Sequence, residues 1–345
     1  MSFEAVRYQV SFTTSWSRLA ADLVLPAGAG PHPAAVLVGA ASGPRDRRRW
    51  TQFLALHGLA TLSWDSPGWG ASSGQRRWQA PDERTMEVVA AVDFLRGVRD
   101  VAPGGISLVG SDSGAWAAAL GAALSSQVSA LVMIAPPCTG APGQELVRLA
   151  QRLRGLGFIS AEISLAQFVL AERIRRLASG EDPRAVIFAE APCRHAPWYG
   201  WLPGVTPEEI ATFATLPGYR AASVLPLVHC PVLGVYGTDD AATPAWDNAN
   251  LLRDALLASP GRDHQVFVLP RSDGAFAGAV PAGEGPVVPG DWHPELVDAV
   301  TDWLLPRLAY PRASHPQFAP PPFPHPQLQL PYAPALAPPG VPRAG

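Results

Sequence analysis

The segment Ile106–Ala118 carries residue types at a spacing that nucleophilic or acid–base chemistry would need. An apolar run leads into Gly110-Ser111-Asp112-Ser113-Gly114, and small residues follow. A strand, a sharp turn and a helix in this order present the central residue of the turn, and the flanking glycines allow close packing. A carboxylate at a helix N-terminus is held ionised, so it can act as a nucleophile or as a base. We therefore expect Asp112 to be catalytic.

Ser111 and Ser113 flank Asp112 and leave an alternative open. If the turn is displaced by one residue, Ser113 becomes the nucleophile. The small residues Gly114 and Ala115 fit an apex at Asp112 better, so Asp112 is preferred. Ser111 is expected to contact the substrate.

Short apolar runs alternate with helical patterns on both sides of this turn. This alternation predicts a mostly parallel sheet with helices on both faces. Within the helix expected at Glu83–Arg96, the carboxylates Glu83, Glu87 and Asp93 are expected on a solvent-exposed face. The strands are expected at Val6–Phe12 and Leu19–Leu25, which form an edge hairpin, and at Ala34–Val38, Leu59–Trp64, Ile106–Val109, Ala130–Ile134, Val232–Tyr236 and Gln265–Leu269.

The alternation stops in the middle of the chain, where helical patterns at Gln144–Arg154, Ala161–Leu177 and Pro207–Ala214 surround an aromatic turn. We therefore predict an α/β core formed by residues 1–137 and 229–308, with a helical cap, residues 138–228, inserted in it. Residues 309–345 form a tail, and twelve of the 38 prolines lie between Pro311 and Gly345. Such a composition favours extended conformations, so we expect the tail to be poorly ordered.

Three further segments carry a resemblance to a known family. They are Ser42-Gly43-Pro44-Arg45-Asp46-Arg47, the stretch from Trp64 to Ser72 with the pattern D-x-x-G-x-G-x-S, and the stretch from Pro231 to Asp240 with the pattern P-V-L-x-x-x-G-x-x-D. Together with the turn at Asp112, they resemble the α/β-hydrolase family, in particular its esterase and dienelactone-hydrolase-like branch. The resemblance covers roughly residues 5–308 and implies the α/β-hydrolase fold with an inserted helical cap.

The chain departs from this family at the residues that the resemblance identifies as catalytic. Asp112 stands where most members carry Ser. An Asp at this position resembles epoxide hydrolases and haloalkane dehalogenases, in which the carboxylate forms an ester with the substrate. Gly274 stands where the resemblance implies the catalytic His, and Asp240 occupies the position of the catalytic acid. Ala41 and Ser42 belong to the loop that resembles the oxyanion loop, and we expect them to bind substrate.

Two histidines are candidates for a relocated role. His293 follows Gly274 by 19 residues, at the start of the last helix, and is an alternative catalytic base. His195 precedes the aromatic turn of the cap. With Trp198, Tyr199 and Trp201 it is expected to line an apolar lid that binds substrate; packing within the cap is the alternative.

Composition excludes several classes of function. The chain has 345 residues, a formal net charge of −3 and only 16% charged residues, which argues against a nucleic-acid binder. Every basic residue is Arg, so Schiff-base, pyridoxal phosphate and P-loop lysine chemistry are excluded. The three cysteines form no C-x-x-C pair, and no dinucleotide fingerprint occurs, so no metal or cofactor is expected.

No signal peptide and no 18-residue apolar stretch is seen in the sequence. We therefore expect a cytoplasmic protein without a membrane partner, and a homodimer is possible.

Three functions remain open. The preferred one is an enzyme in which Asp112 and Asp240 perform acid–base chemistry, such as a cyclase, lyase or isomerase step, on an apolar small molecule of the kind found in secondary metabolism. The second is a hydrolase of an epoxide, halide or ester that uses Asp112 as nucleophile and a relocated base such as His293. The third is a non-catalytic binding protein that has kept the hydrolase-like scaffold.

Overall fold

The computed structural model describes residues 5–39, 48–75, 79, 81–138, 141–203, 210, 221–272 and 293–309. The chain divides into two compact units. One unit comprises Met1–Cys138 and Ala221–Pro321, and the other comprises Thr139–Arg220 and Pro322–Gly345. Each unit has its own core. Of the expected tail at residues 309–345, Ala309 ends the last described helix, and the residues after it lie outside the described residues.

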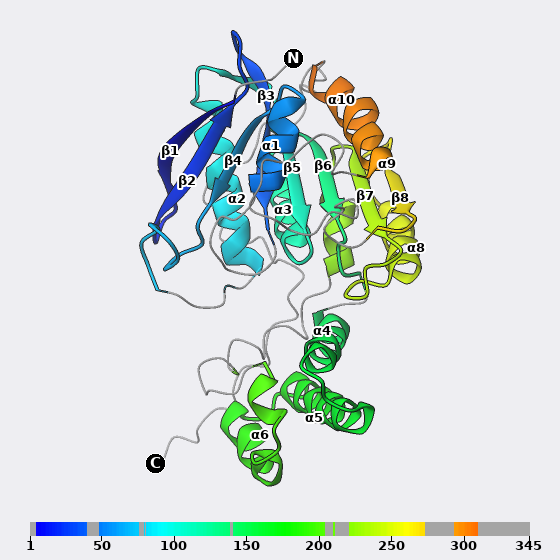
Figure 1. Cartoon of the computed structure of the whole chain (residues 1–345). Helices are drawn as coiled ribbons and strands as arrows, with labels where there is room; N and C mark the ends of the chain where they lie inside the picture. Colours follow the sequence, from blue (N-terminus) through cyan, green and yellow to red (C-terminus); the bar gives the residue numbers. More distant parts are fainter. Residues whose placement is uncertain are drawn as a thin grey trace, which may run out of the picture. The chain divides into compact units, whose positions relative to one another are not determined.

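The first unit is built on an eight-stranded sheet with the order β1-β2-β4-β3-β5-β6-β7-β8 (Figure 1). β1 pairs antiparallel with β2, β2 pairs antiparallel with β4, and all remaining pairs are parallel. The expected edge hairpin and mostly parallel sheet are therefore confirmed. The strands are β1 Val6–Thr13, β2 Arg18–Leu25, β3 His32–Val38, β4 Ala60–Trp64, β5 Val101–Ser111, β6 Val128–Ile134, β7 Val232–Gly237 and β8 Gln265–Leu269.

The central strands are apolar on both sides because helices cover both faces of the sheet. Every residue of β4 and β7 is buried, as expected for strands enclosed in this way. On one face, Phe53, Leu296 and Trp303 pack with strand residues such as Val109 and Val132. The helices of this face are α1 Arg48–Leu56, α9 Pro294–Asp298, the π-helical segment η6 Ala299–Leu304 and α10 Leu305–Ala309.

The other face of the sheet carries α2 Pro81–Arg96, α3 Gly114–Leu124 and α8 Ala245–Leu256. Two glycines allow close packing there. A Cβ on Gly121 of α3 would lie 2.6 Å from a methyl group of Val88 in α2, and one on Gly234 of β7 would lie 2.4 Å from a methyl group of Leu252 in α8. The 3₁₀ segment η4 Ala221–Leu227 leads back from the insertion into β7.

The expected helical insertion between β6 and β7 is confirmed. It contains α4 Ala141–Gly155, α5 Ser160–Ala178, α6 Pro183–Ala189 and the 3₁₀ segments η1 Ala191–Cys193 and η2 Tyr199–Trp201. The sequence did not predict α6, although Asp182-Pro183 is a helix-start signal: the Asp182 carboxylate accepts the backbone N–H of Arg184 at 2.9 Å. The helix expected at Pro207–Ala214 lies largely outside the described residues.

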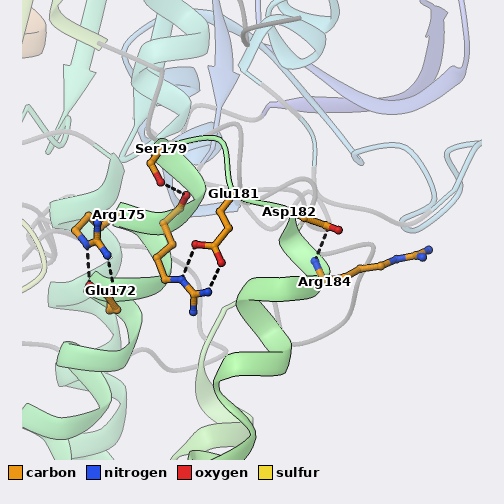
Figure 2. A network of polar contacts seen from close by, with 7 residues as sticks. Glu172, Arg175, Ser179, Glu181, Asp182 and Arg184 are labelled. Carbon is orange, nitrogen blue, oxygen red and sulfur yellow. Dashed lines mark hydrogen bonds and ion pairs between the residues drawn. The ribbon is translucent and has the colours of Figure 1, made fainter. Parts of the chain in front are cut away.

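Polar contacts define the turn between α5 and α6 (Figure 2). Arg176 donates to both carboxylate oxygens of Glu181, and the Ser179 hydroxyl donates to the Arg176 carbonyl at 2.7 Å. One turn earlier, Arg175 pairs with Glu172 on the surface of α5. These contacts end α5 and direct the chain into α6.

A further ion pair in the same unit is buried. Arg173 of α5 is 1% exposed and donates through Nε to Glu190 at 2.9 Å, and Glu190 also accepts the Tyr199 hydroxyl at 2.8 Å. The Arg173 guanidinium donates further to the carbonyl of Pro203. Because every one of these groups has a partner, the network can fix the packing of the unit around one arrangement.

In the part of the chain that the structure describes, we find no helix that combines the length and the apolar character of a membrane span.

Candidate active site

Asp112 lies at the apex of the turn between β5 and α3. Its backbone φ of +53° is in the left-handed region that non-glycine residues rarely adopt. The turn is held on both sides, because the Asp112 N–H donates to the carbonyl of Ile134 at 2.8 Å and its carbonyl accepts from Ala115 at 3.0 Å. The structure thus imposes on Asp112 the strained conformation that presents a side chain at the end of a strand.

The two glycines of the turn are required by close contacts. A Cβ on Gly110 would lie 2.5 Å from the Cα of Ala115, and one on Gly114 would lie 2.0 Å from the carbonyl oxygen of Gly39. Gly114 therefore brings the start of α3 against the residue that follows β3. This explains in physical terms why glycines stand two positions before and two positions after Asp112.

The flanking serines have different positions. Ser111 is the last residue of β5 and is paired in register with Ile134. Ser113 has a right-handed conformation, with φ −61° and ψ −24°, and caps the start of α3 without a side-chain capping bond. The turn is therefore not displaced by one residue, and its apex is Asp112. Among the described residues the buried Ser113 hydroxyl has no hydrogen-bond partner.

Asp240 lies three residues beyond β7, at the same edge of the sheet as Asp112. Its Oδ1 accepts the backbone N–H groups of Ala242 at 2.8 Å and of Thr243 at 3.1 Å, and its own N–H donates to Gly237. These bonds orient the carboxylate. β6 separates β5 from β7, so two strand spacings, about 10 Å, separate the strands that carry Asp112 and Asp240.

His293 is the only histidine that the described residues of the first unit place at the carboxyl edge of the sheet. It lies just before α9, and its Nε2 donates to the carbonyl of Pro270, which follows β8, at 3.0 Å. In a neutral imidazole with this bond, Nδ1 is the acceptor nitrogen; Nδ1 is buried and has no partner among the described residues. β8 is three strand spacings, about 14 Å, from β5.

Several expected site residues fall outside this geometry. Ala41 and Ser42, and Gly274 at the position of the missing His, lie outside the described residues.

The aromatic candidates lie in the second unit. Trp198 and Tyr199 are 2% and 8% exposed and belong to the core of that unit, whereas Trp201 and His195 are exposed. Their burial gives Trp198 and Tyr199 a packing role. Contact of these four residues with a substrate stays a prediction.

Glu87 is a buried carboxyl that the sequence did not reveal. It was expected on the solvent-exposed face of α2, yet it is 1% exposed and accepts hydrogen bonds from the Trp64 indole at 2.8 Å and from Gln79. Asp93, by contrast, is exposed as expected. Burial raises the pKa of Glu87 above its usual range, and the two donors counteract this shift. The expectation for Glu87 was wrong because helical position alone did not reveal that Trp64 ends β4 beside α2.

Cys138 follows β6 near the same edge of the sheet. Its thiol lies 3.4 Å from the hydroxyl of Tyr236, which donates to the carbonyl of Pro136 at 3.0 Å. Burial raises the pKa of Cys138 to about 11. A thiol with this pKa is protonated near neutral pH, which disfavours Cys138 as a thiolate nucleophile.

Among the described residues, no group of three or more His, Cys, Asp or Glu side chains is arranged to hold a metal ion.

Comparisons with solved structures identify the fold. The structure of DcsB in complex with its substrate analogue is 18% identical, covers 90% of this chain and 100% of its own, and has a TM-score of 0.56. Est1E from Butyrivibrio proteoclasticus, with bound ferulic acid, is 19% identical over 87% of this chain and 100% of its own, also with a TM-score of 0.56. An esterase of Pyrococcus furiosus is 14% identical over 78% and 83% of the two chains, with a TM-score of 0.52.

The chain therefore has the α/β-hydrolase fold, with a mixed and mostly parallel sheet and a helical insertion between β6 and β7. No protein-family model and no curated protein matches the sequence. At these identities the structural likeness establishes the fold, and the chemistry has to be argued from the site itself.

Proposed function

We propose that this protein is an enzyme in which the Asp112 carboxylate performs acid–base chemistry on an apolar small molecule, in a cyclase, lyase or isomerase step. The observation that carries the proposal is the conformation of Asp112, whose φ of +53° places a carboxylate at the apex of a turn tightly packed by two glycines. Strained residues of this kind cluster at functional sites, where the surrounding structure holds them in place.

Asp240 is proposed as the second carboxylate of the site. Asp112 and Asp240 follow different strands at the same edge of the sheet, and a separation of about 10 Å between those strands leaves room for a substrate between them. Asp240 is oriented through Oδ1 by two backbone N–H groups. Two carboxylates in unequal surroundings can act as an acid and a base toward one substrate.

The test compares the wild type with Asp112→Asn on a panel of lactones, hydroxy acids, epoxides and esters in H₂¹⁸O. We expect the wild type to give a product that contains no ¹⁸O, because a cyclase, lyase or isomerase step adds no water oxygen. Asp112→Asn should lower turnover by about 10²- to 10⁴-fold, the usual contribution of general acid–base catalysis. An Asn variant as active as the wild type would exclude the proposal.

The surroundings of His293 favour a second candidate function, hydrolysis with Asp112 as nucleophile. The Nε2 bond to Pro270 fixes the imidazole near the carboxyl edge and leaves Nδ1 as a base without a partner among the described residues. Its anchoring at β8, about 14 Å from β5, makes this candidate the weaker one.

The two candidate functions differ in whether a covalent intermediate forms on Asp112. A hydrolase of this type forms an ester between Asp112 and the substrate, which His293→Gln would trap as an increase in protein mass. Intact-mass measurement of His293→Gln after incubation with the epoxides of the panel, and with alkyl halides added to it, distinguishes them. A stable adduct on Asp112 would favour the hydrolase, and its absence with turnover retained would favour acid–base chemistry.

A further inference from the structure

The chain leaves β6 between the two carboxylates proposed for the site. β6 lies between β5 and β7, so the residues that follow it, Ala135–Cys138, leave the sheet between the turn of Asp112 and the loop of Asp240 (Figure 1). We call these residues the spacer segment. Ala135 has a left-handed φ of +46°, and its N–H donates to the Val235 carbonyl at 2.8 Å. A strained backbone of this kind persists only where the surrounding structure holds it.

Two buried aromatic side chains bind the carbonyls of the spacer segment. Trp116 of α3 is 3% exposed and donates its indole N–H to the Pro137 carbonyl at 3.3 Å. Tyr236 of β7 is fully buried, and its hydroxyl donates to the Pro136 carbonyl at 3.0 Å. Because α3 directly follows the turn of Asp112, the spacer segment is tied to the element that carries this turn.

Asn248 of α8 joins the spacer segment to the loop of Asp240. Its side chain is fully buried; Oδ1 accepts the Cys138 N–H at 2.7 Å, and Nδ2 donates to the Pro244 carbonyl at 2.8 Å. The orientation of the amide follows from these partners, because a backbone N–H can only donate and a carbonyl can only accept. Pro244 follows Thr243, whose N–H binds Oδ1 of Asp240. One buried amide therefore connects the two segments.

The bond to Cys138 distinguishes this arrangement from a contact that only forms a helix. A contact that starts α8 needs no partner beyond the Pro244 carbonyl, which lies one turn before Asn248. Cys138, in contrast, is 110 residues earlier in the chain, so its bond contributes nothing to the helix itself. It fixes α8 and the loop before it against the spacer segment.

We infer that Asn248 is a positioning residue, whose amide fixes the Asp240 loop against the spacer segment and so sets the separation of Asp240 from Asp112. The inference rests on the function proposed for these two carboxylates. Asn248 acts through Asp240, because its buried side chain has no surface that a substrate could touch.

The first test is amide hydrogen exchange of the full chain, which requires no substrate. Asn248→Ala removes both side-chain bonds, so we expect the amides of Cys138 and Thr243 to exchange at least about tenfold faster, relative to amides in the centre of β7 that report global unfolding. Asn250→Ala, on the exposed side of α8, is the matched control and should change neither amide. Tyr236→Phe is a milder second variant, because it removes only the hydroxyl, which also lies 3.3 Å from the Asn248 carbonyl. It should speed exchange of Cys138 by about threefold.

The second test is a double-mutant cycle with Asp240 on a substrate that the wild type converts. Asn248→Ala should lower kcat by about 10- to 100-fold and change KM by less than about threefold, because a small displacement of a catalytic group affects the reaction step. In the Asp240→Asn background the same change should cost less than about twofold, because its effect passes through Asp240. Asn250→Ala should keep the kinetics of the wild type.

Unchanged exchange at Thr243 in Asn248→Ala, or at Cys138 in Tyr236→Phe if the first variant does not fold, would overturn the inference. A loss of kcat as large in the Asp240→Asn background as in the wild type would also overturn it, since Asn248 would then have a general structural role. Wild-type turnover by Asp240→Asn alone would instead refute the proposed role of Asp240, and with it any catalytic effect of Asn248, whatever the exchange rates are.

Discussion

At the scale of single residues, the fold holds Asp112 in a conformation that its side chain disfavours. A left-handed non-glycine residue costs of order 1–3 kcal/mol, and glycine would adopt the same conformation more readily. The sequence could predict the turn and its central residue, because the glycine spacing carries that information. It could not predict that Glu87 is buried, because the burial depends on contacts with Trp64 and Gln79.

Asp112→Gly tests whether this strain is retained for function. We expect the free energy of unfolding to rise by about 1 kcal/mol, because glycine relieves the strain, while turnover is abolished. Chemical denaturation gives the first quantity and the substrate panel gives the second. A variant that is less stable and still active would show that Asp112 has a structural role only.

We expect His264 to make the free energy of unfolding depend on pH. The backbone N–H of Val232 donates to its Nδ1 at 3.1 Å, so this nitrogen must be unprotonated, and burial lowers the pKa of His264. As the pH falls, His264 therefore binds a proton in the unfolded chain before it does so in the folded chain. The stabilisation contributed by neutral His264 is fully present above about pH 6.5, the pKa of this residue in the unfolded chain. It is lost as the pH falls from there toward the lower pKa of His264 in the folded chain.

His264→Asn keeps an acceptor, Oδ1, for the Val232 N–H and removes the titration. We expect its free energy of unfolding to fall less steeply than that of the wild type between pH 7 and pH 5. Urea denaturation at several pH values measures the difference, and pH 8 serves as the reference condition. An identical slope in the two proteins would show that His264 does not contribute.

At the scale of elements, the start of α3 is positioned against the end of β3 by the absence of a side chain at Gly114. The sequence predicted all eight strands. Apolar runs enclosed by helices indicated the central strands, and the alternation of apolar and polar residues indicated the edge hairpin. It missed α6, whose seven residues are too few for a periodic signal. The loop that contains Ala41 and Ser42 could not be judged, because it lies outside the described residues.

Gly114→Ala tests this contact. The added Cβ would lie 2.0 Å from the Gly39 carbonyl oxygen, so we expect a loss of about 3 kcal/mol or more in the free energy of unfolding. Gly155→Ala in α4 is the matched control, because nothing lies within 4 Å of its added Cβ. The control should be neutral or stabilising by up to about 1 kcal/mol. Equal effects of the two changes in thermal or chemical unfolding would refute the packing argument.

At the scale of the whole molecule, the protein is two units with separate cores. The core of the second unit includes Tyr199, and its hydroxyl joins the buried ion pair of Arg173 and Glu190. The sequence indicated a helical insertion from its periodicity. It could not indicate this pair, because Arg173 and Glu190 belong to different segments that only tertiary packing brings together.

Glu190→Ala should destabilise the second unit by about 3–5 kcal/mol, because it leaves Arg173 buried without its counter-charge. Glu172→Ala removes the exposed pair with Arg175 and should have little effect, since water screens that pair. Hydrogen exchange of the insertion helices, together with denaturation, locates and measures the loss. If both variants lose the same stability, the buried pair is not a special stabilising element.

The most direct test of the central claim is the turnover of wild type and Asp112→Asn measured side by side on the substrate panel in H₂¹⁸O. If the Asp112 carboxylate performs acid–base chemistry, the wild type yields product without ¹⁸O, and the Asn variant, folded to the same extent, loses about 10²-fold or more of that activity. Product formed at the wild-type rate by Asp112→Asn would contradict the account.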